Sequence, residues 1–426
     1  MLLSILLISF LSLLAVGAPI AVALGTSAVI ILFFFLKLPL IIVTQTMFTA
    51  VDSFSYMALP FFMLAGAFMS TGGVTRRIVD FASAMVGALT GGLALVVAIS
   101  GMFFAALSGS SAATTAAIGI ALIDEMESRG YKRDFAAAVV AAGGTVGIVI
   151  PPSITMVVYG VVAGVSIGDM FLGGFVPGII MGLSMCLVSY FISKKHGYGG
   201  KGKTSLRNIL VTFKDCIWAL LMPVIIIGGI YGGIFTPTES AAVAAVYGML
   251  IGLFVYKELK FSDLPKVILN AALSTAMIMF VISAANLFGW ILTSAQIPHH
   301  LAAAFTNMTS NPIYFLMLVN VLLLFIGTLI NASAAVVILV PILLPVVTTM
   351  GIDPVFFGVM MVVNLAIGCI TPPVGLDLFV VSSITKLPIE RITQRILPYL
   401  AVLIADLLVI TYVPDLILIV PKILGS

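Results

Sequence analysis

The chain has 426 residues, of which 62% are hydrophobic and 8% are charged, and its net charge is +3. Its mean hydropathy is +1.29. Soluble domains are roughly half apolar and a quarter charged, so the composition excludes a soluble protein and predicts a polytopic membrane protein. At about 20 apolar residues per crossing, the length allows roughly ten to fourteen spans or half-spans.

The first 73 residues are predicted to form N-terminal scaffold helices. The apolar run over residues 1–36 has no basic start and no evident cleavage site followed by a soluble domain. We therefore expect it to stay in the membrane and not to be removed as a signal peptide. Gly17-Ala18-Pro19 leaves open whether this run is one kinked helix or two. A second span is expected at about residues 56–70.

Residues 74–193 are predicted to form the first-repeat transport region. An in-plane cytoplasmic helix is expected at 74–88. A hairpin follows at 91–126, with two apolar arms of about sixteen residues, each too short to cross a core of about 30 Å. The hairpin turns at Ser108-Gly109-Ser110-Ser111. The helix at 135–166 is predicted to be broken at Pro151-Pro152, because proline lacks an amide proton and clashes with the preceding turn. A span at about 171–193 completes this region.

The second half is predicted to repeat this order. Residues 194–214 form a basic loop, placed in the cytoplasm by the positive-inside rule, and its basic residues are Lys194, Lys195, Lys201, Lys203, Arg207 and Lys214. Residues 215–297 are assigned to second-repeat scaffold helices, at about 215–234, 240–256 and 271–297. Residues 298–426 form the second transport region. It comprises an in-plane segment at 298–308, a hairpin at 313–350, a broken helix at 354–385 and a C-terminal helix at about 396–420.

An internal repeat supports this division. The sequence Gly147-Ile-Val-Ile-Pro-Pro152 recurs as Gly368-Cys-Ile-Thr-Pro-Pro373, 221 positions later (368 − 147 = 221). Charge then indicates that the two copies are inverted. The loop at 124–134 carries three basic residues and its shifted counterpart around 351–354 has none, whereas 166–179 has none and its counterpart 387–400 carries two. We therefore predict an all-α, inverted-topology repeat with two re-entrant hairpins and two broken transmembrane helices.

The tips of the two hairpins and the breaks in the two helices carry hydroxyls, amides and carbonyls that are free of helical hydrogen bonds. Because sodium is a hard cation that prefers oxygen ligands, we predict about two sodium sites, one in each repeat. The first site is assigned to Ser108, Gly109, Gly144, Thr145 and Gly147, and the second to Gly327, Asn331, Gly368 and Thr371. Helix N-termini near Ala112 and Ala332 would present a positive end to an anion. The substrate-binding residues are predicted to be Ser110, Ser111, Asn331, Ser333 and Asp377.

Few ionisable residues lie deep in the predicted bundle, which favours sodium over proton coupling. The candidates are Asp52, Glu239, Asp377 and Asp406, and the three histidines, His196, His299 and His300, fall in predicted loops. Two roles of Asp377 stay open, namely lining a cavity or helix end, and binding substrate or ion. The three cysteines have the spacing of neither a metal site nor a disulfide framework. With no clustered catalytic set, the chain is not expected to be an enzyme.

Five specific motifs occur along the chain, namely Ser108-Gly-Ser-Ser-Ala-Ala-Thr-Thr-Ala-Ala-Ile-Gly119, Ala142-Gly-Gly-Thr-Val-Gly-Ile-Val-Ile-Pro-Pro-Ser-Ile154, Phe171-Leu-Gly-Gly-Phe-Val-Pro-Gly178, Gly351-Ile-Asp-Pro354 and Ile370-Thr-Pro-Pro-Val-Gly375. With these motifs, the chain resembles the large membrane subunit of tripartite ATP-independent periplasmic (TRAP) transporters along nearly its whole length. The resemblance implies a sodium-driven importer of organic acids, such as C4-dicarboxylates or sialic acids, in the bacterial inner membrane. It also implies an elevator mechanism, in which hairpins and broken helices move as a block against the scaffold.

The resemblance further implies two partners, a soluble periplasmic binding protein and a small four-helix membrane subunit. Because the chain starts directly with the large-subunit pattern, the small subunit is expected to be a separate polypeptide. Asp377 departs from the family pattern, which leads us to expect an uncharged amide at that position. A stand-alone sodium/dicarboxylate symporter of the same architecture remains the alternative, and dependence on a binding protein separates the two.

Overall fold

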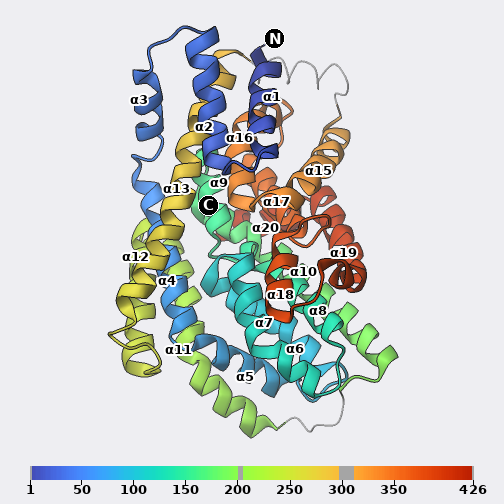
Figure 1. The fold of residues 1–426 in the computed structure, drawn as a ribbon. Helices are drawn as coiled ribbons and strands as arrows, with labels where there is room; N and C mark the ends of the chain where they lie inside the picture. The colour runs from blue at the N-terminus through green and yellow to red at the C-terminus, as the bar shows by residue number, and fades with distance from the viewer. Residues whose placement is uncertain (1, 200–204, 297–310, 425–426) are drawn as a thin grey trace.

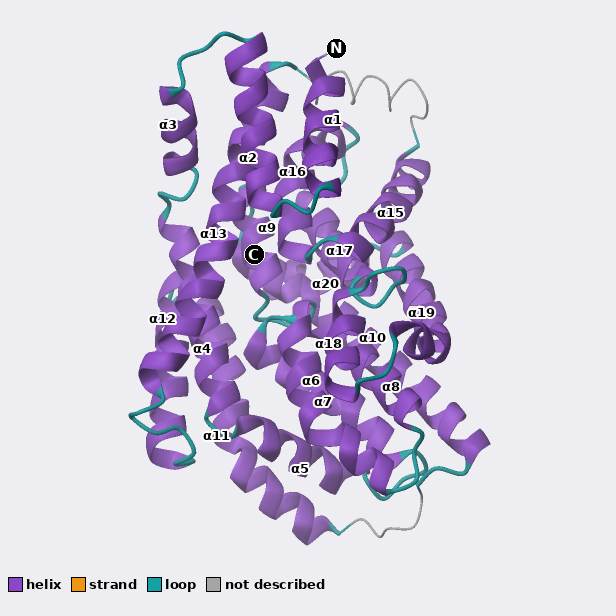
Figure 2. Ribbon diagram, in the orientation of Figure 1, coloured by secondary structure: helices purple, strands orange, loops and turns teal. Residues whose placement is uncertain are grey.

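The computed structural model describes residues 2–199, 205–296 and 311–424, and this part of the chain is built of helices (Figure 2). One isolated β-bridge joins Thr90 to Gly199. By length and composition, eight of the described helices are able to cross a membrane. The predicted in-plane segment at 298–308, together with His299, His300, Lys201 and Lys203, lies outside the described residues.

The first half begins with scaffold helices and continues into a hairpin and a broken helix. Its elements are α1 (Leu2–Ala15), α2 (Ile20–Ile30), η1 (Ile31–Phe35), α3 (Ile41–Thr49), η2 (Phe54–Met57), α4 (Ala58–Thr71), α5 (Val74–Val86), α6 (Gly92–Ser108), α7 (Ser111–Ser128), α8 (Arg133–Thr145), η3 (Val146–Ile148), α9 (Ile154–Ala163) and α10 (Ile167–His196). The apolar N-terminal run is therefore two helices, separated at Gly17-Ala18-Pro19. The short helix α3 was not predicted from the sequence.

The second half has the same order of scaffold, hairpin and broken helix. Its elements are α11 (Leu206–Tyr231), α12 (Pro237–Leu250), η4 (Ile251–Val255), α13 (Leu264–Ser294), α15 (Pro312–Leu329), α16 (Ala332–Thr349), α17 (Pro354–Gly368), α18 (Leu376–Thr385), α19 (Ile389–Tyr412) and α20 (Asp415–Leu424). Figure 1 shows α6 and α7 in the lower half of the molecule and α15 and α16 in the upper half. The two hairpins therefore enter from opposite ends.

Three element boundaries differ from the sequence prediction. The basic segment at 194–214 is mostly helical, because α10 continues to His196 and α11 already begins at Leu206. His196 thus belongs to a helix end and not to a loop. The predicted C-terminal helix is divided at Pro414 into α19 and α20. The hairpin arms have 17 or 18 residues, which at 1.5 Å per residue is about 27 Å for the longer arms, just under the hydrocarbon thickness.

The helix positions repeat in register along the chain. Helix α7 begins at Ser111 and α16 at Ala332 (332 − 111 = 221), and α8 begins at Arg133 and α17 at Pro354 (354 − 133 = 221). Each pair thus starts at the offset of the sequence repeat. Helices α2 and α4 pack against α13, and α12 packs against α4, which forms a scaffold on one side, and the two hairpins and two broken helices form the other side (Figure 1).

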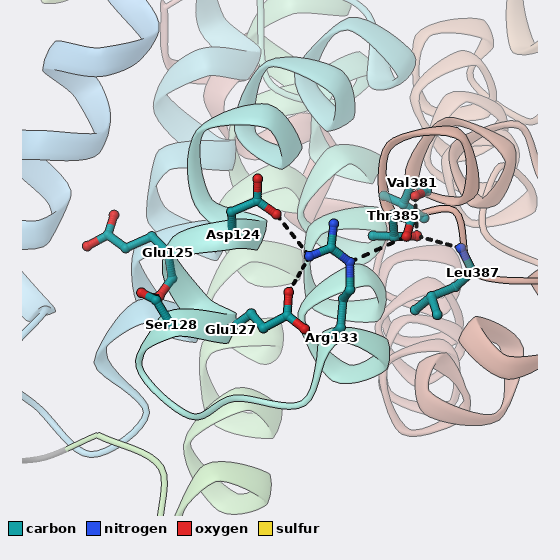
Figure 3. Close-up of polar contacts among 8 residues, drawn as sticks. All are labelled: Asp124, Glu125, Glu127, Ser128, Arg133, Val381, Thr385 and Leu387. Atoms are coloured by element: carbon teal, nitrogen blue, oxygen red, sulfur yellow. Dashed lines mark hydrogen bonds and ion pairs between the residues drawn. The ribbon is translucent and has the colours of Figure 1, made fainter.

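Arg133 joins the two repeats at the end of the molecule where α7 meets α8 (Figure 3). Its guanidinium donates one hydrogen bond to Asp124 Oδ1 at 2.9 Å, a second to Glu127 Oε2, and a third through Nε to the backbone oxygen of Thr385 at 3.3 Å. Asp124 and Glu127 belong to α7, whereas Thr385 ends α18. One side chain therefore ties the first hairpin to the second broken helix.

We expect Arg133→Ala to destabilise the protein by about 1–3 kcal/mol, because hydrogen bonds to charged groups are lost at a half-buried position. Arg129→Ala is the matched control, since Arg129 makes one exposed ion pair with Glu125 four residues earlier, and such pairs contribute about 0.3–0.5 kcal/mol. Thermal unfolding of the purified variants measures both effects. Equal losses of stability in the two variants would contradict the bridging role of Arg133.

Candidate functional site

The two hairpin tips are built on the same plan. Ser110 precedes α7 and accepts a hydrogen bond from the Ala113 amide at 3.4 Å, and Asn331 precedes α16 and accepts one from the Ser333 amide at 2.9 Å. Side-chain oxygens at this position satisfy one of the free amides at a helix start. The two caps are 221 positions apart (331 − 110 = 221). Both tips therefore present a capped helix N-terminus, with its partial positive charge.

The two helix breaks are bonded to the hairpin tips through the backbone. The amide of Ile154, after the first break, donates to the Gly109 oxygen at 3.2 Å, and the amide of Gly375, after the second, donates to the Thr328 oxygen at 3.0 Å. These two amides are again 221 positions apart (375 − 154 = 221). Groups freed from helical bonding are thus satisfied across the break.

The residues of the first predicted ion site are adjacent in space. A Cβ on Gly147 would lie 2.6 Å from Thr114 Oγ1 and 2.7 Å from the Ser110 oxygen, and a Cβ on Gly144 would overlap Thr115 Oγ1. These glycines therefore allow the first tip to contact the first break. Ser108 Oγ lies 2.8 Å from Thr114 Oγ1. The hydroxyl of Thr145 instead donates to its own helix, at the Ala142 oxygen.

The second predicted ion site has the same close contact between tip and break. A Cβ on Gly368 would lie 2.6 Å from the Cα of Gly327, so this approach requires glycine at 368, and a Cβ on Gly327, 3.1 Å from the Cα of Gly368, would require the backbone to shift. Thr371 donates through its hydroxyl to the Ile367 oxygen at 2.8 Å. Asn331 stands at the tip of the same hairpin, with its side-chain oxygen on the Ser333 amide.

A cavity of about 380 Å³ lies between the tips and the scaffold. Its lining includes both tips, at Gly109 to Ala112 and at Asn331 to Ala334, together with residues after both breaks. Helix α13 supplies the opposite wall, with Ser274 and four apolar side chains. Among the lining residues that the structure describes, none carries a charge. The starts of α7 and α16 are therefore the cavity's main source of positive potential.

Four of the five predicted substrate residues line this cavity, namely Ser110, Ser111, Asn331 and Ser333. Asp377 does not, because its side chain is fully buried behind Cys369 and Leu376, which are lining residues. The sequence analysis missed Thr155, whose hydroxyl lies 3.2 Å from Ser333 Oγ and joins α9 to α16. It also missed Ser274, because a single hydroxyl in a long apolar helix has no distinguishing pattern.

Of the four deep acidic residues named from the sequence, Asp377 and Asp406 are buried, whereas Asp52 and Glu239 are exposed. Asp406 accepts a hydrogen bond from Ser184 at 2.9 Å. Cys186, Cys216 and Cys369 are free thiols. The described residues contain no group of three or more His, Cys, Asp or Glu side chains placed to hold a metal ion.

Residues 7–416 match the family model of the tripartite ATP-independent periplasmic transporter, DctM component. The isethionate TRAP transporter permease DctMQ of Oleidesulfovibrio alaskensis is 50% identical over 94% of this chain, which spans only 63% of that protein's length. The C4-dicarboxylate TRAP transporter large permease DctM of Pseudomonas aeruginosa is 46% identical over 89% of each chain. The sialic acid permease SiaM of Vibrio cholerae is 40% identical over 89% of this chain and 88% of its own.

The fold is also found in a solved structure. The Alcanivorax borkumensis YdaH transporter, whose crystal structure has an unusual topology, matches 84% of this chain and 86% of its own, with a TM-score of 0.60 at 15% identity. This likeness concerns the fold alone. The family model, in contrast, covers nearly the whole sequence, and the relatives that share its sequence are transporter permeases. The chain therefore belongs to the DctM family of TRAP transporter large permeases, which are multi-pass proteins of the bacterial inner membrane.

Proposed function

We propose that this chain imports an organic acid across the inner membrane, with sodium as the coupling ion. The observation that carries the proposal is the uncharged cavity into which the N-termini of α7 and α16 open. An anion in this cavity would be stabilised by helix amides and hydroxyls, in the way that helix N-termini bind carboxylates and phosphates. The relatives named for isethionate, C4-dicarboxylate and sialic acid share organic anions as a substrate class.

Sodium coupling is supported by the composition of the tip-and-break contacts. At the first contact, the Ser110 carbonyl oxygen and the Thr114 hydroxyl, which also contacts Ser108, lie against Gly147 of the break. At the second, Asn331 and Thr371 follow the contacting glycines Gly327 and Gly368 by four and three residues (331 − 327 = 4; 371 − 368 = 3). Unwound backbone at membrane depth with oxygens facing inward is the arrangement that binds sodium in transporters with inverted repeats. We infer one sodium ion at each contact.

An elevator movement is supported by where the cavity lies. Its moving wall would be the two tips and two breaks, and its fixed wall would be α13 with α4 and α2 of the scaffold. Contacts within the first group are polar and include the Arg133 bonds and the Thr155–Ser333 contact. Against α13, the lining is mostly apolar, with Met277, Ile278 and Val281. Apolar side chains can slide past one another without leaving hydrogen bonds unpaired.

The family description, a tripartite periplasmic transporter, supports two partners. We infer that a small four-helix membrane subunit contacts the scaffold and that a periplasmic binding protein delivers the substrate. Many apolar side chains of α11 and α13 are exposed, among them Leu210, Val224, Leu269 and Leu273. In a membrane they face lipid or another helix, so the scaffold has surface available for a second subunit.

Proteoliposomes containing this chain and its small subunit test the proposal directly. With an inward sodium gradient and the cognate binding protein present, we expect uptake of a labelled organic acid from a panel of C4-dicarboxylates, sulfonates and sialic acids. Omitting either sodium or the binding protein should abolish uptake. Sodium-driven uptake that persists without the binding protein would instead establish a stand-alone symporter.

Two pairs of substitutions at helix-capping residues, each a hairpin tip with a matched control, test the binding cavity. Asn331→Ala should lower uptake by roughly tenfold or more and raise the sodium concentration for half-maximal uptake, because it removes oxygen and amide groups from the cavity. Asn311→Ala is the control, because Asn311 caps the start of α15 with the same geometry, 2.9 Å from the Ile313 amide. Ser110→Ala and its control Ser166→Ala, which caps α10, form the second pair.

Each cap should contribute about 1 kcal/mol to stability, whether or not it lines the cavity. The controls therefore account for the loss of a cap as such, and thermal unfolding of all four variants checks this. Uptake that falls equally in Asn311→Ala and Asn331→Ala would mean that the tips act only as helix caps.

A further inference from the structure

A buried polar cluster lies behind the cavity, where the first repeat meets the second. Asp377, in the first turn of α18, is fully buried, and neither of its carboxyl oxygens makes a hydrogen bond of good geometry within the described parts of the chain, although the hydroxyls of Ser111 and Thr115 lie close enough to interact with it. Thr115, on α7, is also fully buried, and its hydroxyl likewise has no partner there. Ser111, one turn before Thr115, lies beside the same carboxyl group. A carboxyl group and two hydroxyls therefore converge from opposite repeats.

The surroundings of Asp377 differ from those of Asp134, a buried carboxylate that is paired. Asp134 is also buried, but it accepts hydrogen bonds from Arg395 at 3.1 Å and from the Phe135 amide at 2.8 Å. No lysine, arginine or histidine of the described residues lies within ion-pairing distance of Asp377. A buried carboxylate at membrane depth without a positive partner is strongly unfavourable. A neutral state of Asp377 therefore requires either a bound proton or a cation beside the carboxyl group.

The donor set indicates which charge would complete the cluster. The groups facing Asp377 are the hydroxyls of Ser111 and Thr115 and the thiol of Cys369, and the Ser111 backbone oxygen lies nearby, against Gly144. Neutral oxygens next to one carboxylate suit a hard cation of single charge, whereas soft metals need imidazole or thiolate clusters. On the α18 side, the Asp377 amide donates to the Cys369 oxygen at 3.0 Å, which fixes the start of the helix against the second break.

We propose that Asp377, Thr115 and Ser111 form a third binding site, for a monovalent cation, next to the first tip-and-break contact, where Thr115 and the Ser111 backbone oxygen lie against Gly144. The proposal deepens the proposed sodium-coupled transport and rests on it. Each of the two tip-and-break sites takes its ligands from one repeat, whereas this site joins α7 of the first repeat to α18 of the second. Since Ser111 and Cys369 also line the cavity, the cation would lie directly behind the substrate and hold the two halves of the moving block together.

The test is equilibrium binding of ²²Na⁺ to the purified full chain in lipid nanodiscs, with potassium and lithium as competitors. Asp377→Asn keeps the shape of the side chain and removes its charge, and we expect it to bind one sodium ion fewer per chain than the native protein. Thr115→Val removes one hydroxyl ligand, and we expect a roughly fivefold weaker affinity at one site. Asp406→Asn is the matched control, because Asp406 is a buried acid on α19 with its own hydroxyl partner, Ser184.

Unchanged sodium binding in both Asp377→Asn and Thr115→Val would overturn the proposal. So would an Asp377→Asn protein that keeps its full sodium content while its uptake loses pH dependence, because Asp377 would then carry a proton. If Asp377→Asn fails to fold, Thr115→Val decides the question by affinity. Failure of the transport proposal gives a different result. Uptake by the native protein would then not depend on the sodium gradient, while sodium binding would still depend on Asp377.

Discussion

The fold depends on the requirement that backbone groups released inside the membrane find partners. A proline pair in each of two transmembrane helices removes helical hydrogen bonds, and each unpaired group in hydrocarbon costs several kcal/mol. In this chain, the amides of Ile154 and Gly375 are bonded to the carbonyl oxygens of Gly109 and Thr328. Each break is therefore stable only with a hairpin tip beside it. This mutual dependence explains why hairpin and broken helix occur together in both repeats.

Once tip and break are joined, the location of the cavity follows. A helix starts at each hairpin tip, so the free amides and positive dipole ends of α7 and α16 lie where the two repeats meet. The breaks contribute carbonyl oxygens next to each tip. Anion and cation positions are thus built from backbone, with few ionisable side chains. Small residues are needed for this approach, as the contact between Gly327 and Gly368 shows.

Much of this arrangement was predictable from the sequence, because breakers and charges leave local signals. The Pro-Pro repeat located both breaks, and the loop charges indicated the inversion that Figure 1 shows as hairpins entering from opposite ends. Contacts between distant segments were not predictable. The three bonds of Arg133 and the cavity wall on α13 depend on tertiary packing that has no pattern in the sequence. Helix ends such as Leu206 and Pro414 were misplaced because amphipathic turns and loop prolines give weak boundaries.

The neutral tip-and-break sites and the Asp377 cluster have different consequences for a moving block. An empty site made of carbonyls and hydroxyls carries no net charge, so its passage along an apolar scaffold adds no charge-burial cost. A buried carboxylate is different, because it must be neutralised in every position that the block occupies. On the cation-site proposal, the ion beside Asp377 accompanies the block in both directions, so it is a condition for movement and is not itself transported. Sequence relatives with an amide at this position would lack that condition and would bind one cation fewer.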